Sequence, residues 1–476
     1  MKSRKQLRRL VMTGLVLTCL GNFDLTSAMA PPSPLPQTDS SIMSTPPDGN
    51  FPPGPPPDGN FLPGPPPDGK FGGMANNQND AASLMATKII DKTAVEITGQ
   101  NLSNSNSDEN VILVRNGGNF TLRNSELSKT GDSSSADASN FTGQNAVLLV
   151  NNSQATLENV TLISDADGAN ALFATGEKAV LTAKHIKIHT KNNSSRGLDA
   201  TYSGTINAED VDITTEGAHC GALATDRGEG NVIVKGAKLK TSGEGSPCIY
   251  STGNIQLTDG TGIATGSEIA VVEGKNSILL NNTVLTGHVK HGVMLYQSFS
   301  GDANVGIATF TAKDSTLNNN SDGPMFYITN TTAQATLENT QLNQSGDILV
   351  KVTSDRWGSA GKNGGDFTLN AKNQNLNGQI LSNNISKVTL NLNDGSNFTG
   401  TINNDRQAKT ASVNLTKGAY WTLTADAYVT TITDEQADFS NITGNKHTIY
   451  YDKESNPKLN GQTISLPGEG SLKPMS

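Results

Sequence analysis

Three successive stretches of the chain share one arrangement: ALFATGEKAVLTAKHIKI at residues 171–188, GLDATYSGTINAEDVDI at residues 197–213 and GALATDRGEGNVIVKGAKL at residues 221–239. Each begins with a short apolar run, passes through a glycine-containing turn and enters a longer run in which apolar and polar residues alternate. Alternation with a period of two is typical of β-strands, and glycine marks turns. The shared order predicts a repeat with two strands in each unit.

Both runs recur along most of the chain. The longer run is found as FTLRNSEL from Phe120, ATLENVTL from Ala155, VLTAKHIKI from Val180, TINAEDVDI from Thr205, VIVKGAKL from Val232, SILLNNTVL from Ser277, TFTAKDSTL from Thr309 and ATLENTQL from Ala335. The short run is found as ALFAT from Ala171, GLDAT from Gly197, GALAT from Gly221, CIYST from Cys248, IAVVE from Ile269, VMLYQ from Val293 and MFYIT from Met325. Spacings mostly in the twenties suit one turn of a solenoid. The fold class predicted is all-β, a right-handed parallel β-helix.

Composition agrees with this fold and excludes several others. Only 34% of the 476 residues are hydrophobic and 5% aromatic, with 48 glycines, which excludes a helical bundle or coiled coil. The formal net charge is −9 and no basic patch stands out. Nucleic acid and anionic lipid surfaces are therefore not expected as partners.

The N-terminal part predicts export. Basic residues precede an apolar stretch at 10–20 and a run of small residues, so residues 1–30 are predicted to be a secretory signal peptide. Residues 31–83 contain PPDGNF repeats and are predicted to be a disordered, semi-rigid proline-rich linker. No further transmembrane segment is expected, so the protein is predicted to be secreted or held at the cell surface.

The C-terminal part carries a resemblance. DGSNFTGTIN from Asp394 and GAYWTLTADAYVTTI from Gly418 resemble the terminal coils of bacterial β-helix passenger domains, found in autotransporter and adhesin-like proteins of the pectin-lyase-like type. We therefore expect a β-helix over residues 84–375 and terminal coils with a cap over residues 376–476. The sequence departs from autotransporters because it shows no C-terminal outer-membrane barrel.

Stacking the short runs predicts a ligand-binding row on one outer face. Leu172, Leu198, Ala222, Ile249, Ala270, Met294 and Phe326 are predicted to face inward, so the residues that follow them face outward. The outward row gives Phe173, Asp199, Tyr250 and Tyr327 as candidate glycan-binding residues, with aromatic rings stacking on sugars. The alternative is that loops, or residues 84–110, cover this mostly apolar row.

The resemblance also implies an enzymatic alternative, because many such β-helix proteins are polysaccharide lyases or hydrolases. Asp199, Asp226 and Glu229 are the candidate catalytic residues, although Asp199 and Asp226 fall on different columns. The competing interpretation is that DRGEG, from Asp226, is a polar turn. A purely structural surface component is a third possibility. An adhesin-like protein that binds a polysaccharide or cell-surface glycan without catalysis is the prediction favoured here.

Few residues suggest a covalent or metal site. Cys220 and Cys248 are expected on successive coils and are candidates for a disulfide, one residue out of register. SDADGAN from Ser164 is similar to part of a calcium loop but lacks the remaining ligands. His219 is a lone histidine near a turn. No cofactor or metal is expected.

Overall fold

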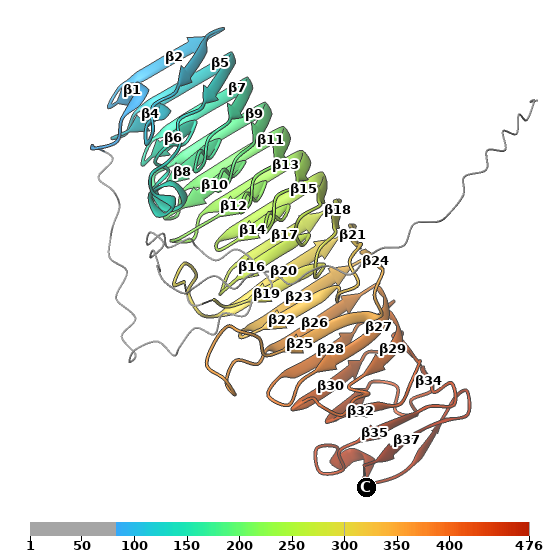
Figure 1. The fold of residues 1–476 in the computed structure, drawn as a ribbon. Helices are drawn as coiled ribbons and strands as arrows, with labels where there is room; N and C mark the ends of the chain where they lie inside the picture. The colour runs from blue at the N-terminus through green and yellow to red at the C-terminus, as the bar shows by residue number, and fades with distance from the viewer. Residues whose placement is uncertain (1–81, 299, 476) are drawn as a thin grey trace, which may run out of the picture. The chain divides into compact units, whose positions relative to one another are not determined.

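The computed structural model describes residues 82–298 and 300–475. These residues form a parallel β-solenoid whose strands stack coil upon coil (Figure 1). One side is a fifteen-stranded sheet, here sheet A, made of β1 (Ala86–Asp91), β4 (Asn110–Arg115), β6 (Leu148–Asn151), β8 (Leu172–Thr175), β10 (Leu198–Thr201), β12 (Leu223–Thr225), β14 (Ile249–Ser251), β16 (Ala270–Glu273), β19 (Val293–Tyr296), β22 (Phe326–Thr329), β25 (Ile348–Thr353), β27 (Asn375–Ser382), β29 (Asn397–Ile402), β31 (Tyr420–Leu423) and β34 (Ile442–Thr443).

The longer runs form the second sheet, sheet B. Its strands are β2 (Ala94–Thr98), β3 (Asn101–Asn104), β5 (Asn119–Lys129), β7 (Gln154–Ser164), β9 (Val180–Thr190), β11 (Thr205–Thr215), β13 (Asn231–Thr241), β15 (Asn254–Ala264), β17 (Ser277–Asn281), β18 (Val284–Gly287), β20 (Ile307–Lys313), β21 (Thr316–Asn319), β23 (Thr332–Glu338), β24 (Gln341–Gln344), β26 (Asp366–Lys372), β28 (Lys387–Leu392), β30 (Thr410–Leu415) and β33 (Thr431–Asp434). The predicted all-β parallel β-helix is confirmed, with right-handed crossovers between the parallel strands.

Sheet B bends sharply at one position in each coil from the first coils to β26. The residues there have a left-handed backbone, with φ between 47° and 74°, and they form the bend column: Gly99, Asn124, Asn159, His185, Asp210, Gly236, Asp259, Asn282, Asp314, Asn339 and Asn373. Asparagine, aspartate and glycine tolerate this conformation best, which explains their abundance in the column. The bend lets one strand supply two faces of the coil.

The core is a stack of aliphatic rows between the sheets. Inward residues of both sheets form one continuous buried cluster along the described coils. The period-two prediction of inward and outward residues is confirmed in general, but two assignments were one residue out of register. Leu198 pairs with Leu223 rather than Ala222, and Ala270 pairs with Val293 rather than Met294. The first error arises because Thr225 follows Leu223 by two residues whereas Thr201 follows Leu198 by three, so aligning these threonines shifts the register. The second arises from aligning Glu273 with Gln297, whereas the structure pairs Glu273 with Tyr296.

A small third sheet lies at the C-terminal end. Its strands are β32 (Ala427–Val429), β35 (Thr448–Tyr451), β36 (Ile464–Leu466) and β37 (Gly470–Pro474), and the pair β36–β37 is antiparallel. An antiparallel hairpin ends the parallel stacking, as a solenoid cap must.

Helices are scarce in the described residues. A π-helix, η1 (Ala138–Thr142), and a 3-10 helix, η2 (Pro457–Leu459), are the two helical segments there. Within the same residues we find no helix long and apolar enough to span a membrane. The predicted signal peptide and nearly all of the predicted proline-rich linker lie outside the described residues.

Candidate functional site

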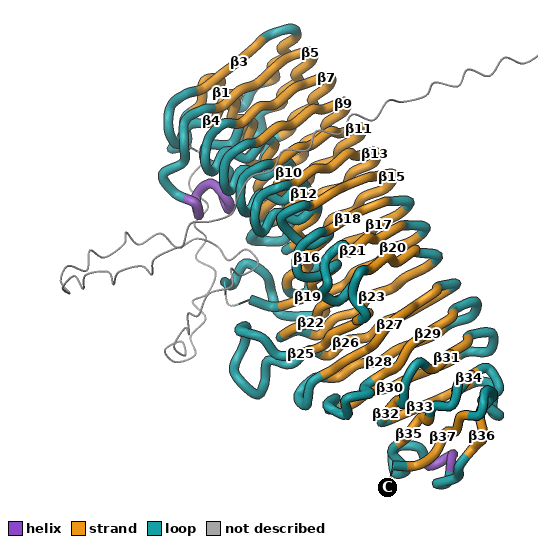
Figure 2. The backbone as a smooth tube through the Cα atoms, turned by 45° about the vertical axis from the view of Figure 1, so that its right-hand side comes forward, coloured by secondary structure: helices purple, strands orange, loops and turns teal. Residues whose placement is uncertain are grey.

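The outward row of sheet A is covered by three inserted segments. They are residues 130–147 between β5 and β6, which include η1, residues 297–298 and 300–306 between β19 and β20, and residues 354–365 between β25 and β26. Figure 2 shows η1 and the loops near β19 and β25 on the same side of the solenoid. The alternative expectation, that other segments cover this row, is therefore confirmed, and most of the cover comes from these segments rather than from residues 84–110.

The predicted sugar-stacking residues take part in internal packing. Phe173 is 0% exposed in a cluster with Leu84, Leu113 and Leu149. Tyr327 is 8% exposed, stacks on the His291 ring at 4.1 Å between ring centroids and donates to Asp355 Oδ2 at 2.7 Å. These two rings are closed to a ligand in this structure.

Tyr250 is only half-buried, but its hydroxyl is engaged. It donates to Glu273 Oε2 at 2.8 Å, and Tyr296 donates to the same oxygen at 2.8 Å. Burial raises the pKa of the Glu273 carboxyl, against the hydrogen bonds that stabilise its charged form. Tyr296 is not among the predicted residues, because the one-residue register error put Gln297 at its position, whereas the structure pairs Glu273 with Tyr296.

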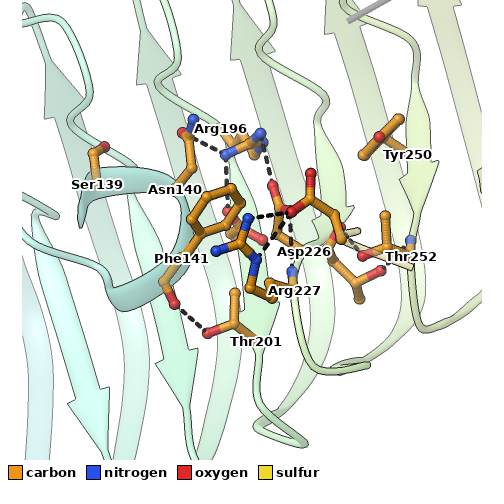
Figure 3. Close-up of polar contacts among 12 residues, drawn as sticks. Ser139, Asn140, Phe141, Arg196, Thr201, Asp226, Arg227, Tyr250 and Thr252 are labelled. Carbon is orange, nitrogen blue, oxygen red and sulfur yellow. Dashed lines mark hydrogen bonds and ion pairs between the residues drawn. The ribbon is translucent and has the colours of Figure 1, made fainter. Parts of the chain in front are cut away.

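Arg196 is the centre of a buried polar cluster, the Arg196 cluster (Figure 3). Its Nη1 donates to Asn140 Oδ1 at 2.7 Å and to Asp199 Oδ2 at 3.3 Å, and its Nη2 lies 2.9 Å from Asp226 Oδ2. The two predicted catalytic carboxylates therefore do come together, on different columns but on the same arginine. Asp199 is 0% exposed and Asp226 2% exposed.

A second arginine, Arg227, covers the cluster. The Arg227 guanidinium lies 3.8 Å from the centre of the Phe141 ring, and its Nη2 is 2.6 Å from Asp302 Oδ1. Phe141 comes from η1 and Asp302 from the inserted segment at 300–306, so these contacts hold both inserted segments over sheet A. The Thr201 hydroxyl also donates to the Phe141 carbonyl at 3.0 Å.

The buried carboxyls have shifted protonation. Burial raises the pKa of Asp199 to about 6, although Arg196 opposes the shift. Burial also raises the pKa of Asp226 well above its ordinary value, with Arg196 opposing and Asp302 adding to the effect. Shifted carboxyls are common in active sites, but here they have no opening to solvent.

The turn interpretation of DRGEG holds for Glu229 but not for Asp226. Asp226 takes the position after β12 that Thr201 takes in β10, and its side chain lies in the covered cluster rather than in a free turn. Glu229 does lie in a turn, with φ 61°, and its Oε1 is 2.9 Å from Lys275 Nζ. The structure therefore separates Glu229 from the pair at Arg196, and the three candidate catalytic residues do not face one shared opening.

The cysteines are free and buried in this structure, so the predicted disulfide is not present in it. Cys220 stacks between Ser195 and Ser246: the Ser195 amide donates to Cys220 Sγ, and the Cys220 amide donates to Ser246 Oγ at 2.9 Å. Cys248 instead belongs to the apolar core. The two thiols are two residues out of register, one more than expected, and they have different surroundings.

The acidic residues of the stretch similar to a calcium loop are engaged in other contacts. Asp165 Oδ2 is 2.8 Å from Lys191 Nζ, and Asp167 Oδ1 accepts from the Asn193 amide at 3.0 Å. His219 is partly buried in a turn, where burial lowers the pKa of its imidazole. Among the described residues, no group of three or more histidine, cysteine or acidic side chains is placed to hold a metal ion.

An open groove lies instead on the outside of sheet B, along the bend column. This bend groove has a volume of about 700 Å³ and runs across five strands, β7, β9, β11, β13 and β15. Its exposed side chains are polar, and the buried residues Val160, Ile186 and Val211 also line it. The groove exists because each strand turns at its left-handed residue, which leaves a concave line on the outside.

Charged side chains line the bend groove in register. Lys187, Asp212 and Lys238 are paired neighbours on successive strands, and all three are exposed. On the bend column itself, His185 Nδ1 lies 3.3 Å from Asp210 Oδ2. This groove was not predicted, because a straight strand was expected for each long run. The signal that could have revealed it is the Asn, Asp, His or Gly at a fixed position in each run.

We compared the chain with protein-family models, curated proteins and solved structures, and none of them matches it.

Proposed function

We propose that this protein is an exported, adhesin-like surface protein that binds a polysaccharide or cell-surface glycan along the outer face of sheet B. The observation that supports this is the bend groove, which is open, crosses five coils and is lined by side chains that donate and accept hydrogen bonds. The proposal keeps the predicted mode of action, multivalent contact along one face, but moves it from sheet A to sheet B.

The chemistry of the groove suits sugar hydroxyls. A hydroxyl both donates and accepts, so a surface that alternates lysine, carboxylate and amide groups can satisfy it in both directions. Because strands repeat at about 4.8 Å, equivalent groups recur at short, fixed intervals along an extended polymer. The stacked backbone holds these groups in place before binding, which lowers the entropic cost of association.

Catalysis is the weaker candidate. A lyase or hydrolase that used Asp199, Asp226 and Glu229 would need these carboxylates to reach a substrate together. Asp199 and Asp226 are buried beneath Phe141 and Arg227, and Glu229 is paired elsewhere. We therefore propose binding without bond cleavage.

The test is a glycan-array screen of the secreted protein with two matched variants. The groove variant carries Lys187→Ala, Asp212→Ala and Lys238→Ala, and the control carries Lys178→Ala, Asp322→Ala and Lys351→Ala, which removes the same charges at exposed positions outside the groove. We expect the wild type to bind a glycan, the groove variant to bind it about tenfold or more weakly, and the control to bind it as the wild type does. Release of reducing ends from a bound glycan would favour the enzyme instead. Absence of binding to any glycan, or equal binding by the groove variant, would contradict the proposal.

A further inference from the structure

A second hollow lies on the outer face of sheet B, near the C-terminal end of the solenoid. This amide pocket has a volume of about 300 Å³. The polar residues that line it come from four neighbouring strands and the positions just after them: Asn370 of β26, Asn391 and Asn393 at the end of β28, Asn414 and Thr416 at the end of β30, and Thr433 and Glu435 at the end of β33. It lies on different strands from the bend groove and shares no lining residue with it.

The asparagines of the pocket form a directed ladder. Asn391 Nδ2 donates to Asn370 Oδ1 at 2.7 Å, Asn414 Nδ2 donates to Asn391 Oδ1 at 2.8 Å, and Thr433 Oγ1 donates to Asn414 Oδ1 at 2.5 Å. Each amide has two N–H donors and two acceptor lone pairs, so these bonds use only half of the capacity of Asn391 and Asn414. The ladder also fixes the orientation of each amide. The unused N–H donors and lone pairs are therefore held in place before a ligand binds.

Stacking of the coils does not require this ladder. In the coils before β26, the same outward position is occupied by Thr336, Thr311 and Leu279, and their strands pair in the same parallel register. Along this column, consecutive amides occur in β26, β28 and β30. Strand pairing in the column therefore does not depend on them.

An unsatisfied acceptor also lines the pocket. Asp434 Oδ2 is buried and has no hydrogen-bond partner in the described part of the chain, while Asp434 Oδ1 accepts from the Gln436 amide at 2.8 Å. A buried acceptor without a donor is costly. The pocket lining has no lysine, arginine or aromatic ring, and it has two acidic residues, Asp434 and Glu435.

From these contacts we infer that the amide pocket is a binding site for a neutral sugar unit of a glycan. Amides, hydroxyls and carboxylates match the hydroxyls of an uncharged hexose, whereas a uronic acid would bring its negative charge next to Asp434 and Glu435. The inference adds a second site to the proposed function and does not depend on the bend groove.

The experiment measures binding of cellotetraose, mannotetraose and galactotetraose to the full secreted chain by saturation-transfer NMR, with tetragalacturonate as the charged counterpart. The test variant is Asn391→Thr with Asn414→Thr, because threonine already occupies this column at Thr311 and Thr336. The control variant is Asn207→Thr, at the same outward column in β11. Loss of several hydrogen bonds should weaken binding of a neutral tetrasaccharide about tenfold or more in the test variant and leave it unchanged in the control.

Two results would overturn the inference: no neutral tetrasaccharide binds the wild-type chain, or the double variant binds it as tightly as the wild type does. The groove variant separates this test from that of the proposed function. If the amide pocket is a site, the groove variant retains the neutral tetrasaccharide. If the groove variant no longer binds the neutral tetrasaccharide and the Asn391→Thr, Asn414→Thr variant still does, the amide-pocket inference fails while the proposed function stands.

Discussion

At the scale of single residues, Arg196 organises the covered face of sheet A. It contacts Asn140, Asp199 and Asp226, so one guanidinium joins an inserted segment to two neighbouring coils. Removing one partner from a buried ion pair is costly because the other charge stays buried. The two carboxylates that suggested catalysis are better explained as partners of this arginine.

The raised pKa of Asp199 gives a pH dependence with a defined sign. In the unfolded chain this carboxyl has its ordinary pKa of 3.8, and in the folded chain about 6, so between these values the folded state binds more protons. Stability should therefore fall as pH rises from 4 to 7, by at most about 3 kcal/mol from this residue. The pKa of Asp226 is shifted in the same direction.

We expect the free energy of unfolding of the wild type, relative to Asp199→Asn, to decrease from pH 4 to pH 7 in denaturant titrations. Thr201→Val removes no titrating group, so the difference in free energy of unfolding between this variant and the wild type should stay constant over this pH range. A constant difference between Asp199→Asn and the wild type would refute the raised pKa of Asp199.

The two cysteines should respond differently to the same substitution. Cys220→Ser should change the free energy of unfolding by less than about 1 kcal/mol, because Ser195 and Ser246 already make the equivalent bonds in neighbouring coils. Cys248→Ser should cost about 1–3 kcal/mol, since it puts a hydroxyl into the apolar core. Chemical unfolding of both variants measures this. Equal losses of about 2–5 kcal/mol would instead indicate a disulfide.

At the scale of elements, the bend column determines the shape of sheet B. Asp314, on this column between β20 and β21, has φ 48° and accepts from Asn339 Nδ2 at 2.7 Å. A side chain branched at Cβ is disfavoured there, whereas glycine occupies the same column at Gly236.

We therefore expect Asp314→Val to be less stable than Asp314→Gly by about 1–2 kcal/mol, measured by thermal or chemical unfolding. Both variants lose the bond from Asn339, so their difference isolates the backbone conformation. Thr316→Val, two residues later in the extended strand β21, is the control and should change stability little. If the valine and glycine variants of Asp314 were equally stable, the bend would not depend on the left-handed conformation.

The elements themselves could be predicted from sequence, because strand periodicity is local. The runs that start at Val180 and Thr205 each alternate apolar and polar residues and follow a turn of their own, so two strands per coil can be predicted from the sequence alone. The register could not be predicted as well, since it depends on turns of unequal length. Matching the final threonines placed Thr225 beside Thr201, whereas the structure places Asp226 there.

At the scale of the whole solenoid, the described coils have one covered face and one open face. The cover depends on contacts between residues far apart in sequence: Arg196 and Asn140 are 56 residues apart, and Arg227 and Asp302 are 75 apart. No local pattern encodes such contacts, so the sequence could suggest the polar residues of the site but not that loops close over them. The binding surface predicted for sheet A is therefore better placed on sheet B.

The most direct test of this account is lysine-reactivity footprinting of the purified protein, with and without a glycan selected from the array. Lys187 and Lys238 line the bend groove, and Lys351, at the end of the outward row on sheet A, is the internal control. We predict that the glycan protects Lys187 and Lys238 from acylation and leaves Lys351 as reactive as before. Protection of Lys351 with unchanged reactivity of Lys187 and Lys238 would contradict the account and return the binding site to sheet A.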